Sequence, residues 1–516
     1  MGEASLTNIL NLTRILRCFN LSSGLKINFK KSFLYGIGIE QGSATSLARV
    51  IRCKVGSFPF TYLGVPVGQN MNLVKNWNIV LEKISNRLSS WKQNSLSFGG
   101  RITLAKSILS SIPLYYMSLF RAPRHVINSI EVIRRRFCWG GTPGKSKISW
   151  VAWPSMLSSK ENGGIGLGSI RASNLSLLLK WLWRLKDNKN ALWATVIKAI
   201  HYNPRSWETF PCKKTIMGPW KNIIKTVEDL KHLDINVMEM LSCKVGDGSD
   251  ALFWLDNWLG RGRLKDLYLA LFYNEKNKWC VVKDRVGRDF PADLNWQWKQ
   301  TPWHPTIYHM ISQCKQFIPP IILNVKRDTW LWGDAHPMEF SVKAVRELIE
   351  DRLLPSNNFQ IPWSTWVPIK VNVFAWRAGL DRIPSKDGLS KRGIPINPMC
   401  SICLAKSETT DHLLLKCELA SSVWDKVFLW CKAPRELILT IKDILNVQDS
   451  WPFSIGHKKL LHAIFLISLW CIWKARNARC FDNKAFEPGE IFGDVKTMSY
   501  LWIKNRGNIQ NLNWDS

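Results

Sequence analysis

Residues 400–417 read CSICLAKSETTDHLLLKC, and this stretch decides how the region around it folds. It holds three cysteines and one histidine with the spacing Cys-x2-Cys-x8-His-x4-Cys. A CxxC turn can place two thiolates about 2.3 Å from one Zn²⁺ ion, and a later His and Cys can complete the tetrahedron. We therefore predict that one structural zinc ion is bound by Cys400, Cys403, His412 and Cys417. Because the protein supplies all four ligands, no position is left for a catalytic water.

Other interpretations of these cysteines are disfavoured by the flanking residues. A thioredoxin-like CxxC would leave His412 and Cys417 without a role. A RING-type double site needs a second ligand set, and Cys431 with His457 does not supply one. Four unrelated residues that fall close together by chance remain the alternative to a zinc site.

The chain is strongly basic and has the composition of a folded protein. Its 516 residues include 71 Lys and Arg against 39 Asp and Glu, a formal net charge of +32, while hydrophobic residues make up 46%. This length corresponds to roughly three domains. A charge this large opposes compaction unless an anion offsets it. Nucleic acid is therefore the leading partner, an anionic membrane surface comes second, and a solvated basic surface is the plainest alternative.

Two features bear on the compartment. The first residues, MGEASLTNIL, lack the basic start and apolar stretch of a secretory signal. The 13 cysteines therefore favour a reducing compartment, nuclear or cytoplasmic, over a disulfide framework. The apolar stretch 460–473, LLHAIFLISLWCIW, is shorter than a bilayer span and contains His462. We predict a buried helix there and no membrane contact.

The hydrophobic pattern is helical from residue 71 to residue 185. One apolar stripe alternates spacings of three and four residues through Val74, Trp77, Leu81, Ile84, Leu88 and Trp91. Further helices are predicted over 101–112, around 126–137 and over 174–185, with basic residues off their apolar faces. The expected structure here is a helical bundle with basic outer faces.

Four other observations complete the pattern. Before residue 71, SGLKINFKKS (23–32) and TYLGVPVG (61–68) predict two short extended pieces with turns. GGIGLG (163–168) predicts a turn rather than a dinucleotide site, because no βαβ pattern frames it. GDGSDALFWLDNW (246–258) predicts a turn followed by a short strand or hairpin.

Catalytic motifs are absent from the sequence, which has no Asp-Asp pair, no P-loop and no GxSxG elbow. Two-metal phosphoryl transfer needs clustered carboxylates, so the sequence gives no sign of that chemistry.

Several of these stretches resemble, in the same order, plant LINE-type (non-LTR) retroelement reverse transcriptases. SGLKINFKKS with YLGVPVG resembles the stretch just after the catalytic aspartates, and residues 91–123 resemble the thumb. GDGSDALFWLDNW resembles the connecting region of the family. Residues 368–394, with CSIC and TTDHLLLKC, resemble the reverse-transcriptase zinc-binding domain, and IWKARN (472–477) resembles the segment after it.

The resemblance implies a mainly α fold of the α+β class, divided into five regions. These are a small β remnant of the palm with a primer-grip-like segment (1–70), a thumb-like helical region (71–200), a Trp-rich connecting region (201–335), a zinc-stapled helical domain (336–436) and a helical tail (437–516). It also implies RNA or DNA as the partner. The candidate contacts are Lys26, Lys30, Lys31, Tyr62, Gly64, Lys83, Arg87, Arg101, Lys106, Arg134, Arg135 and Arg136.

In the family, an aromatic-Ala-Asp-Asp motif lies shortly before the position of Met1. The resemblance therefore implies a fragment of an RNA-directed DNA polymerase that lacks the catalytic aspartates and is inactive by itself. Two other classes stay open. One is a co-opted protein whose zinc module docks another protein, and the other is a decayed element without a selected function. The sequence does not decide whether RNA, DNA or a hybrid is bound.

Overall fold

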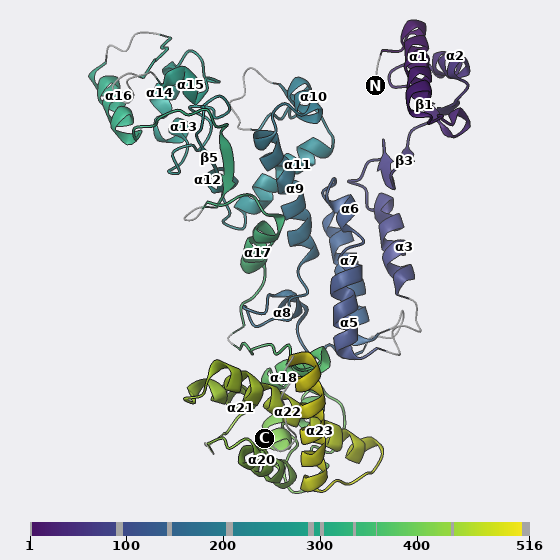
Figure 1. The fold of residues 1–516 in the computed structure, drawn as a ribbon, viewed down its shortest axis with the longest axis vertical. Coiled ribbons are helices and arrows are strands. Elements are labelled where there is room, and N and C mark those ends of the chain that lie inside the picture. The colour runs from purple at the N-terminus through teal and green to yellow at the C-terminus, as the bar shows by residue number, and fades with distance from the viewer. Residues whose placement is uncertain are drawn as a thin grey trace. The chain divides into compact units, whose positions relative to one another are not determined.

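A computed structural model describes residues 3–88, 96–141, 147–202, 210–286, 294–299, 304–333, 337–357, 359–434 and 438–507. These residues are mainly helical and contain three two-stranded sheets (Figure 1). The predicted mainly α class is confirmed. The chain divides into two compact units, Met1–Ile79 and Val80–Ser516. The finer division into five regions stays a prediction.

The first unit combines helices with pairs of short strands. Its elements are α1 (Leu6–Ser23), η1 (Phe29–Lys31), β1 (Phe33–Tyr35), α2 (Gln41–Ile51), β2 (Lys54–Gly56), β3 (Phe60–Tyr62), β4 (Val65–Val67) and η2 (Val74–Trp77). Strands β1 and β2 pair in parallel across α2, whereas β3 and β4 form an antiparallel hairpin. Leu63 and Gly64 close this hairpin with φ values of 48° and 81°. Two positive φ values suit the right-handed twist of the paired strands.

The two extended pieces predicted in this unit have different outcomes. The piece at 61–68 is the β3–β4 hairpin. The piece predicted at 23–32 forms no strand: it contains the end of α1, the left-handed cap Gly24 (φ 72°), a short irregular segment in which Asn28 is extended, and the turn η1. Its glycine stops a helix and does not begin a strand, because its backbone N–H bonds back to Asn20 O.

The basic helices follow. They are α3 (Asn78–Arg87), α5 (Phe98–Leu104) with the π turn η3 (Ala105–Leu109), α6 (Leu114–Met117) and α7 (Arg124–Trp139). The predicted stripe holds at Trp77 and Ile84, which are fully buried, but Val74 is exposed because a 3₁₀ turn precedes α3. Trp91 lies outside the described residues. In α7 the predicted inward positions Val126, Ile130 and Phe137 are buried, whereas the fourth, Ile133, is only partly buried.

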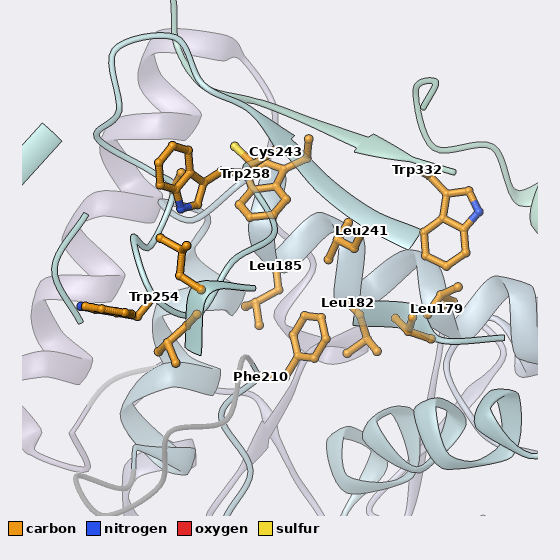
Figure 2. Close-up of a cluster of buried hydrophobic side chains, with 14 of the residues drawn as sticks. Leu179, Leu182, Leu185, Phe210, Leu241, Cys243, Trp254, Trp258 and Trp332 are labelled. Carbon is orange, nitrogen blue, oxygen red and sulfur yellow. The ribbon is translucent and has the colours of Figure 1, made fainter. Parts of the chain in front are cut away.

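Helix α9 (Ile170–Asp187) contributes a row of leucines to a hydrophobic core that extends to α17. The elements of this part of the chain are α8 (Trp153–Leu157), α10 (Leu192–His201), α11 (Pro219–Lys231), α12 (Val237–Met240), β5 (Leu241–Lys244), α13 (Leu264–Leu267), α14 (Leu269–Asn274), α15 (Val282–Arg285), α16 (Pro305–Phe317), β6 (Thr329–Trp332) and α17 (Val342–Leu353). Figure 2 shows Leu179, Leu182 and Leu185 of α9 among buried aromatic side chains such as Trp254 and Trp332. The predicted Trp-rich region thus buries its rings against α9.

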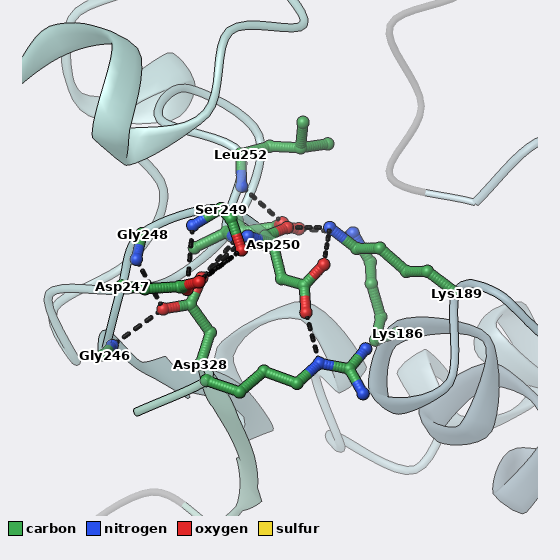
Figure 3. Close-up of polar contacts among 12 residues, drawn as sticks. Lys186, Lys189, Gly246, Asp247, Gly248, Ser249, Asp250, Leu252 and Asp328 are labelled. Atoms are coloured by element: carbon green, nitrogen blue, oxygen red, sulfur yellow. Dashed lines mark hydrogen bonds and ion pairs between the residues drawn. The ribbon is translucent and has the colours of Figure 1, made fainter. Parts of the chain in front are cut away.

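The motif GDGSDALFWLDNW lies beside β5 and β6, which pair antiparallel. The Asp328 carboxylate, just before β6, accepts hydrogen bonds from four backbone amides in the turn at the start of this motif (Figure 3). The donors are Gly246 at 2.7 Å, Gly248 at 2.9 Å, Asp250 at 2.8 Å and Ala251 at 2.9 Å. The predicted turn is confirmed, but residues 251–258 form no strand: Leu252 and Asn257 make only single bridges, to Val281 and Ser242 respectively.

The remaining helices surround the cysteine cluster. They are α18 (Ile369–Gly379), α19 (Lys386–Ser390), the π turn η4 (His412–Lys416), α20 (Glu418–Trp430), α21 (Ile441–Ser450), α22 (Ile455–Phe481) and α23 (Pro488–Gly507). By length and composition α22 could cross a membrane. It packs against α18, α21 and α23, and residues 461–469 are buried, as predicted, whereas Ile455 and Phe481 at its ends are exposed. It is longer than the predicted stretch because Ser454 caps its start.

Candidate metal centre and basic surface

Four side chains converge within the C-terminal helices. The ligand atoms of Cys400, Cys403, His412 and Cys417 all lie within 4.8 Å of one another. His412 Nε2 is 3.3 Å from Cys403 Sγ. Donors at zinc-bonding distance around a tetrahedral ion lie about 3.8 Å apart, so small side-chain shifts suffice to close the site. Cys400 and Cys417 are fully buried and His412 is 7% exposed. The donor set and its burial fit a structural zinc ion.

Local backbone geometry brings the ligands together. Met399 pairs with Ser407 in an antiparallel bridge, and Cys400 N donates to Lys406 O at 2.8 Å. This short loop turns the first two cysteines toward each other. The π turn η4 then joins the second two ligands, because Cys417 N donates to His412 O at 2.6 Å. An i→i+5 turn places residue i+5 over residue i, which an α-helical turn does not.

Hydrogen bonding prepares Cys400 for a cation. The Cys417 thiol and the backbone N–H groups of Cys403 and Ile402 point at the Cys400 sulfur. Together they outweigh burial and lower the pKa of the Cys400 thiol, while the same hydrogen bond, with burial, raises the pKa of Cys417, so that without metal one proton is held between the two sulfurs. The thiolate is the form that binds zinc.

A buried carboxylate fastens the CxxC loop to helix α22. Glu408 is fully buried, and its Oε2 accepts from Ser401 N at 3.2 Å and from Ser401 Oγ at 3.0 Å. Its Oε1 accepts from Lys386 N at 2.9 Å and from Arg476 Nε at 3.1 Å, with a second, shorter bond from Arg476 Nη2. Burial raises the pKa of Glu408, but Arg476 and the two amides outweigh it and hold this pKa below its ordinary value.

The segment before His412 adds three more ties. Thr409 Oγ1 accepts from His412 N at 3.1 Å and fixes the ligand's backbone. Thr410 Oγ1 donates to Asp381 Oδ1 at 2.6 Å. Asp411 Oδ1 accepts from Ile441 N at 2.9 Å, at the start of α21. Thr409 therefore holds the zinc ligand itself, whereas Thr410 and Asp411 connect the zinc loop to two different parts of the surrounding structure.

Residues 340–424 match the family described as zinc-binding in reverse transcriptase. The predicted structural zinc site is thereby confirmed, since the matched domain contains the buried Cys₃His cluster. Among curated proteins, an Arabidopsis thaliana protein whose name describes a ribonuclease H protein is 28% identical over 445 residues, 82% of this chain and 68% of that protein. An uncharacterised mitochondrial protein of Arabidopsis thaliana is 28% identical over 150 residues, 29% of this chain and 93% of that protein.

Most candidate nucleic-acid contacts lie on the surface, in two units that are described separately. In the first unit, Lys26, Lys30 and Lys31 are exposed between α1 and β1, and Tyr62 and Gly64 are exposed at the β3–β4 hairpin. In the second unit the exposed residues are Lys83 and Arg87 of α3, Lys106 of η3, and Arg135 and Arg136 of α7. Arg101 of α5 is half-buried. Whether they bind nucleic acid stays a prediction.

Arg134 differs from its neighbours and its assignment is corrected here. Its side chain has no exposed surface. Nη1 donates to Glu131 Oε2 at 2.8 Å, and Nη2 donates to Ser110 Oγ and to Leu167 O, both at 3.0 Å. Arg134 therefore holds the GGIGLG turn against α7 and has no atom to offer a phosphate.

Three arginines within the zinc-binding domain, Arg377, Arg382 and Arg392, were not among the predicted site residues. The Arg377 guanidinium lies 5.2 Å from the Phe98 ring centroid and 5.6 Å from that of Trp139. Arg392 stacks on Trp150, 4.1 Å from the ring centroid. Burial and the charge of Arg392 lower the pKa of Arg377 to about 10. Within the described residues, Arg377, Arg392 and the exposed Arg382 form no ion pair. No local sequence pattern identifies them, because the aromatic rings that Arg377 and Arg392 contact lie in other segments of the chain.

Proposed function

We propose that this chain is the nucleic-acid-holding part of a retroelement reverse transcriptase, and that it binds RNA or DNA without supplying catalytic carboxylates. The match of residues 340–424 to the reverse-transcriptase zinc-binding family carries the proposal. A formal net charge of +32 supports it, because a polyanion is the partner that such a charge attracts.

The packing between the zinc-binding domain and the basic helices supports a joint surface. Gly99 of α5 lies so close to α18 that a Cβ there would come within 3.1 Å of Lys370 Cα. Arg377 of α18 adds contacts with Phe98 and Trp139 on the other side of this junction. A zinc-dependent domain thereby supports the helix that carries Arg101, so zinc binding and the shape of the basic surface are coupled.

The distribution of carboxylates supports binding without catalysis. Magnesium-dependent phosphoryl transfer needs several carboxylates around one or two ions. Across the described ranges, the Cys₃His cluster is the group of three or more metal-binding side chains that the structure brings together. We therefore expect no nucleotide incorporation by this chain with either Mg²⁺ or Mn²⁺, and robust primer extension would contradict this half of the proposal.

Salt dependence tests the binding half. Binding of labelled RNA, DNA and hybrid duplexes to the purified zinc-loaded chain is measured between about 50 and 200 mM salt. If six or more phosphates are contacted, affinity falls by about a thousandfold over this range. A protein-docking module with an apolar interface loses little affinity with salt. Absence of binding at the lowest salt concentration would overturn the proposal.

A further inference from the structure

Three arginines of the zinc-binding domain lie close together although their charges repel one another. Arg377 is on α18, Arg382 follows that helix, and Arg392 follows α19. Burial, and then the charge of Arg392, lowers the pKa of Arg377, and burial followed by the charge of Arg382 lowers the pKa of Arg392. Arg392 is therefore within electrostatic reach of both others. We call these three residues the arginine group. Like charges gathered in this way destabilise a fold unless an anion offsets them.

The neighbouring carboxylates are engaged by other residues. Asp381 Oδ1 accepts from Thr410 Oγ1 at 2.6 Å, and the Asp387 carboxylate pairs with Lys391 at 2.6 Å. Across the described ranges, no ion pair includes a member of the arginine group. Within that part of the chain, the arginine group therefore lacks a fixed counter-charge.

Aromatic rings from outside the matched domain hold two of the guanidinium groups. Arg377 lies 5.2 Å from the ring centroid of Phe98 and 5.6 Å from that of Trp139. The Trp150 ring is shared, since its centroid is 5.9 Å from the Arg377 guanidinium and 4.1 Å from that of Arg392. An aromatic face attracts the flat side of a guanidinium and leaves the N–H groups on its edge available. The rings thus fix two like charges beside each other without neutralising them.

Both of these guanidinium groups keep N–H donors for a ligand. Arg377 Nε donates to Arg382 O at 3.1 Å, and Arg392 Nη2 donates to Trp150 O at 3.1 Å. Their other donor nitrogens have no hydrogen-bond partner among the described residues. The two Nη atoms of Arg377 are not among the fully buried nitrogens that lack a partner, so they retain accessible surface, and Arg392 is exposed. A phosphate accepts from such a planar fork through two oxygens at once.

We propose that the arginine group binds backbone phosphates of a nucleic-acid strand where the zinc-binding domain meets α5 and α7. The inference rests on the proposed function, and it names the part of the nucleic acid that is held and the residues that hold it. Arg101 of α5 extends the site, because its guanidinium packs closely against Gly140, next to Trp139. Phosphate contacts carry no base information, so binding at this site is independent of sequence.

The charge of the whole chain favours a phosphate strand over an acidic protein segment. Carboxylates also accept hydrogen bonds from a guanidinium fork. The formal net charge of +32, however, extends far beyond three arginines, as a long polyanion requires, whereas an acidic peptide needs only a local patch. An acidic peptide is therefore the competing occupant in the test.

Binding of labelled oligo(dT) and oligo(dC) to the full zinc-loaded chain at several salt concentrations tests the proposal. We expect the double variant Arg377→Gln, Arg392→Gln to bind both about tenfold or more weakly than the wild-type chain at low salt. The slope of log affinity against log salt concentration should become shallower by roughly 1.4, because each lost phosphate contact contributes about 0.7 for a single strand. The matched control Lys276→Gln, Lys426→Gln removes two exposed charges elsewhere and should change neither quantity.

A single variant and a competitor sharpen the test. Arg392→Gln alters an exposed residue, so it should stay folded, which circular dichroism and zinc content verify. It should bind oligo(dT) about threefold or more weakly. An unlabelled polyglutamate peptide of matched charge should displace labelled oligo(dT) at least roughly tenfold less effectively than unlabelled oligo(dT) does. Equal displacement would overturn the phosphate assignment.

The outcomes separate the two proposals. Unchanged affinity and salt dependence in the folded double variant, or an equal loss in the control, overturns the arginine site and leaves nucleic-acid binding by the other basic residues intact. If no oligonucleotide binds the wild-type chain, the proposed function fails first, and phosphorus NMR with pyrophosphate then tests the site by itself. Line broadening that is lost in Arg392→Gln supports a phosphate site, and absence of broadening with the wild-type chain overturns it.

Discussion

The Glu408 carboxylate and the Arg476 guanidinium form a buried ion pair that connects the zinc loop to helix α22. Their side chains are 0% and 5% exposed, respectively. The same carboxylate holds Ser401, which lies between the first two zinc ligands. Arg476 is thus a positioning residue for the metal site, although 59 residues separate it from its nearest ligand in sequence, Cys417.

Removal of Arg476 should damage both folding and zinc affinity. In Arg476→Met, Glu408 keeps a buried charge without its partner, which costs about 3–5 kcal/mol. Loss of a group that orients metal ligands typically weakens metal affinity by about 10–100-fold. Thermal unfolding and competition with a zinc chelator measure the two effects. Lys474→Ala, on the same helix, is the control because Lys474 and Asp494 form an exposed pair.

A double variant separates charge from packing. Glu408→Gln with Arg476→Met removes both charges, so its loss of stability should be smaller than that of Arg476→Met alone. A double variant as unstable as the sum of the single variants would show that the pair acts through packing and not through charge.

Loss of one zinc ligand should unfold the domain locally, because metal-binding free energy is also folding free energy in small sites. Cys403→Ser should reduce bound zinc from one equivalent to a small fraction, as measured by elemental analysis of the purified chain. Cys431→Ser is the matched control, since Cys431 lies outside the cluster and should leave the zinc content unchanged. Full zinc content in Cys403→Ser would contradict the ligand assignment.

Acid should release the metal. A thiol whose pKa is lowered in the folded state contributes its full stability above its unfolded pKa and loses this contribution as the pH falls through the folded pKa. Hydrogen bonds lower the pKa of the Cys400 thiol, so the metal-binding form should be held at neutral pH and zinc should be lost in acid. Zinc retention after equilibration from neutral to acidic pH is the measurement. Zinc content that does not fall in acid would contradict the prediction.

The parts of this structure that were predicted from sequence depend on local spacing. The zinc ligands fall within one short loop and one π turn, and Leu175, Leu178 and Leu185 follow a single helical period that buries them all. Arg134 was misassigned for the opposite reason. It belongs to a run of three arginines whose exposure is decided by distant groups, here the carbonyls of the GGIGLG turn.

Long-range pairs were not predictable in the same way. Arg476 stands among Lys474, Asn477 and Arg479, so the sequence does not mark it as buried. Nothing in the sequence identifies Glu408 as its partner either. Likewise, Arg377 approaches the Phe98 ring only because α18 packs against α5.

The amide cradle around Asp328 should contribute strongly to the stability of the Trp-rich region (Figure 3). Asp328→Asn replaces an acceptor of four backbone hydrogen bonds with an amide whose NH₂ group faces N–H donors. We expect a loss of about 2–4 kcal/mol, because charge-assisted bonds contribute about 1.5–3 kcal/mol each and are not additive. Chemical unfolding measures it. Asp494→Asn, at an exposed position, should change stability by less than about 1 kcal/mol.

Adjacent arginines of α7 offer the sharpest test of the basic surface. Arg135 and Arg136 are exposed. The double variant Arg135→Ala, Arg136→Ala should therefore bind nucleic acid about tenfold or more weakly at low salt, and its affinity should depend less steeply on salt concentration. The free energy of unfolding should change by less than about 0.5 kcal/mol. Lys276→Ala with Lys426→Ala removes the same charge from exposed positions elsewhere and controls for net charge. Equal losses in the two double variants would show a nonspecific charge effect and contradict a contact at α7.

Arg134→Met should behave in the opposite way. It should destabilise the fold by about 3–5 kcal/mol, because Glu131 loses its partner, and should leave affinity per folded molecule unchanged.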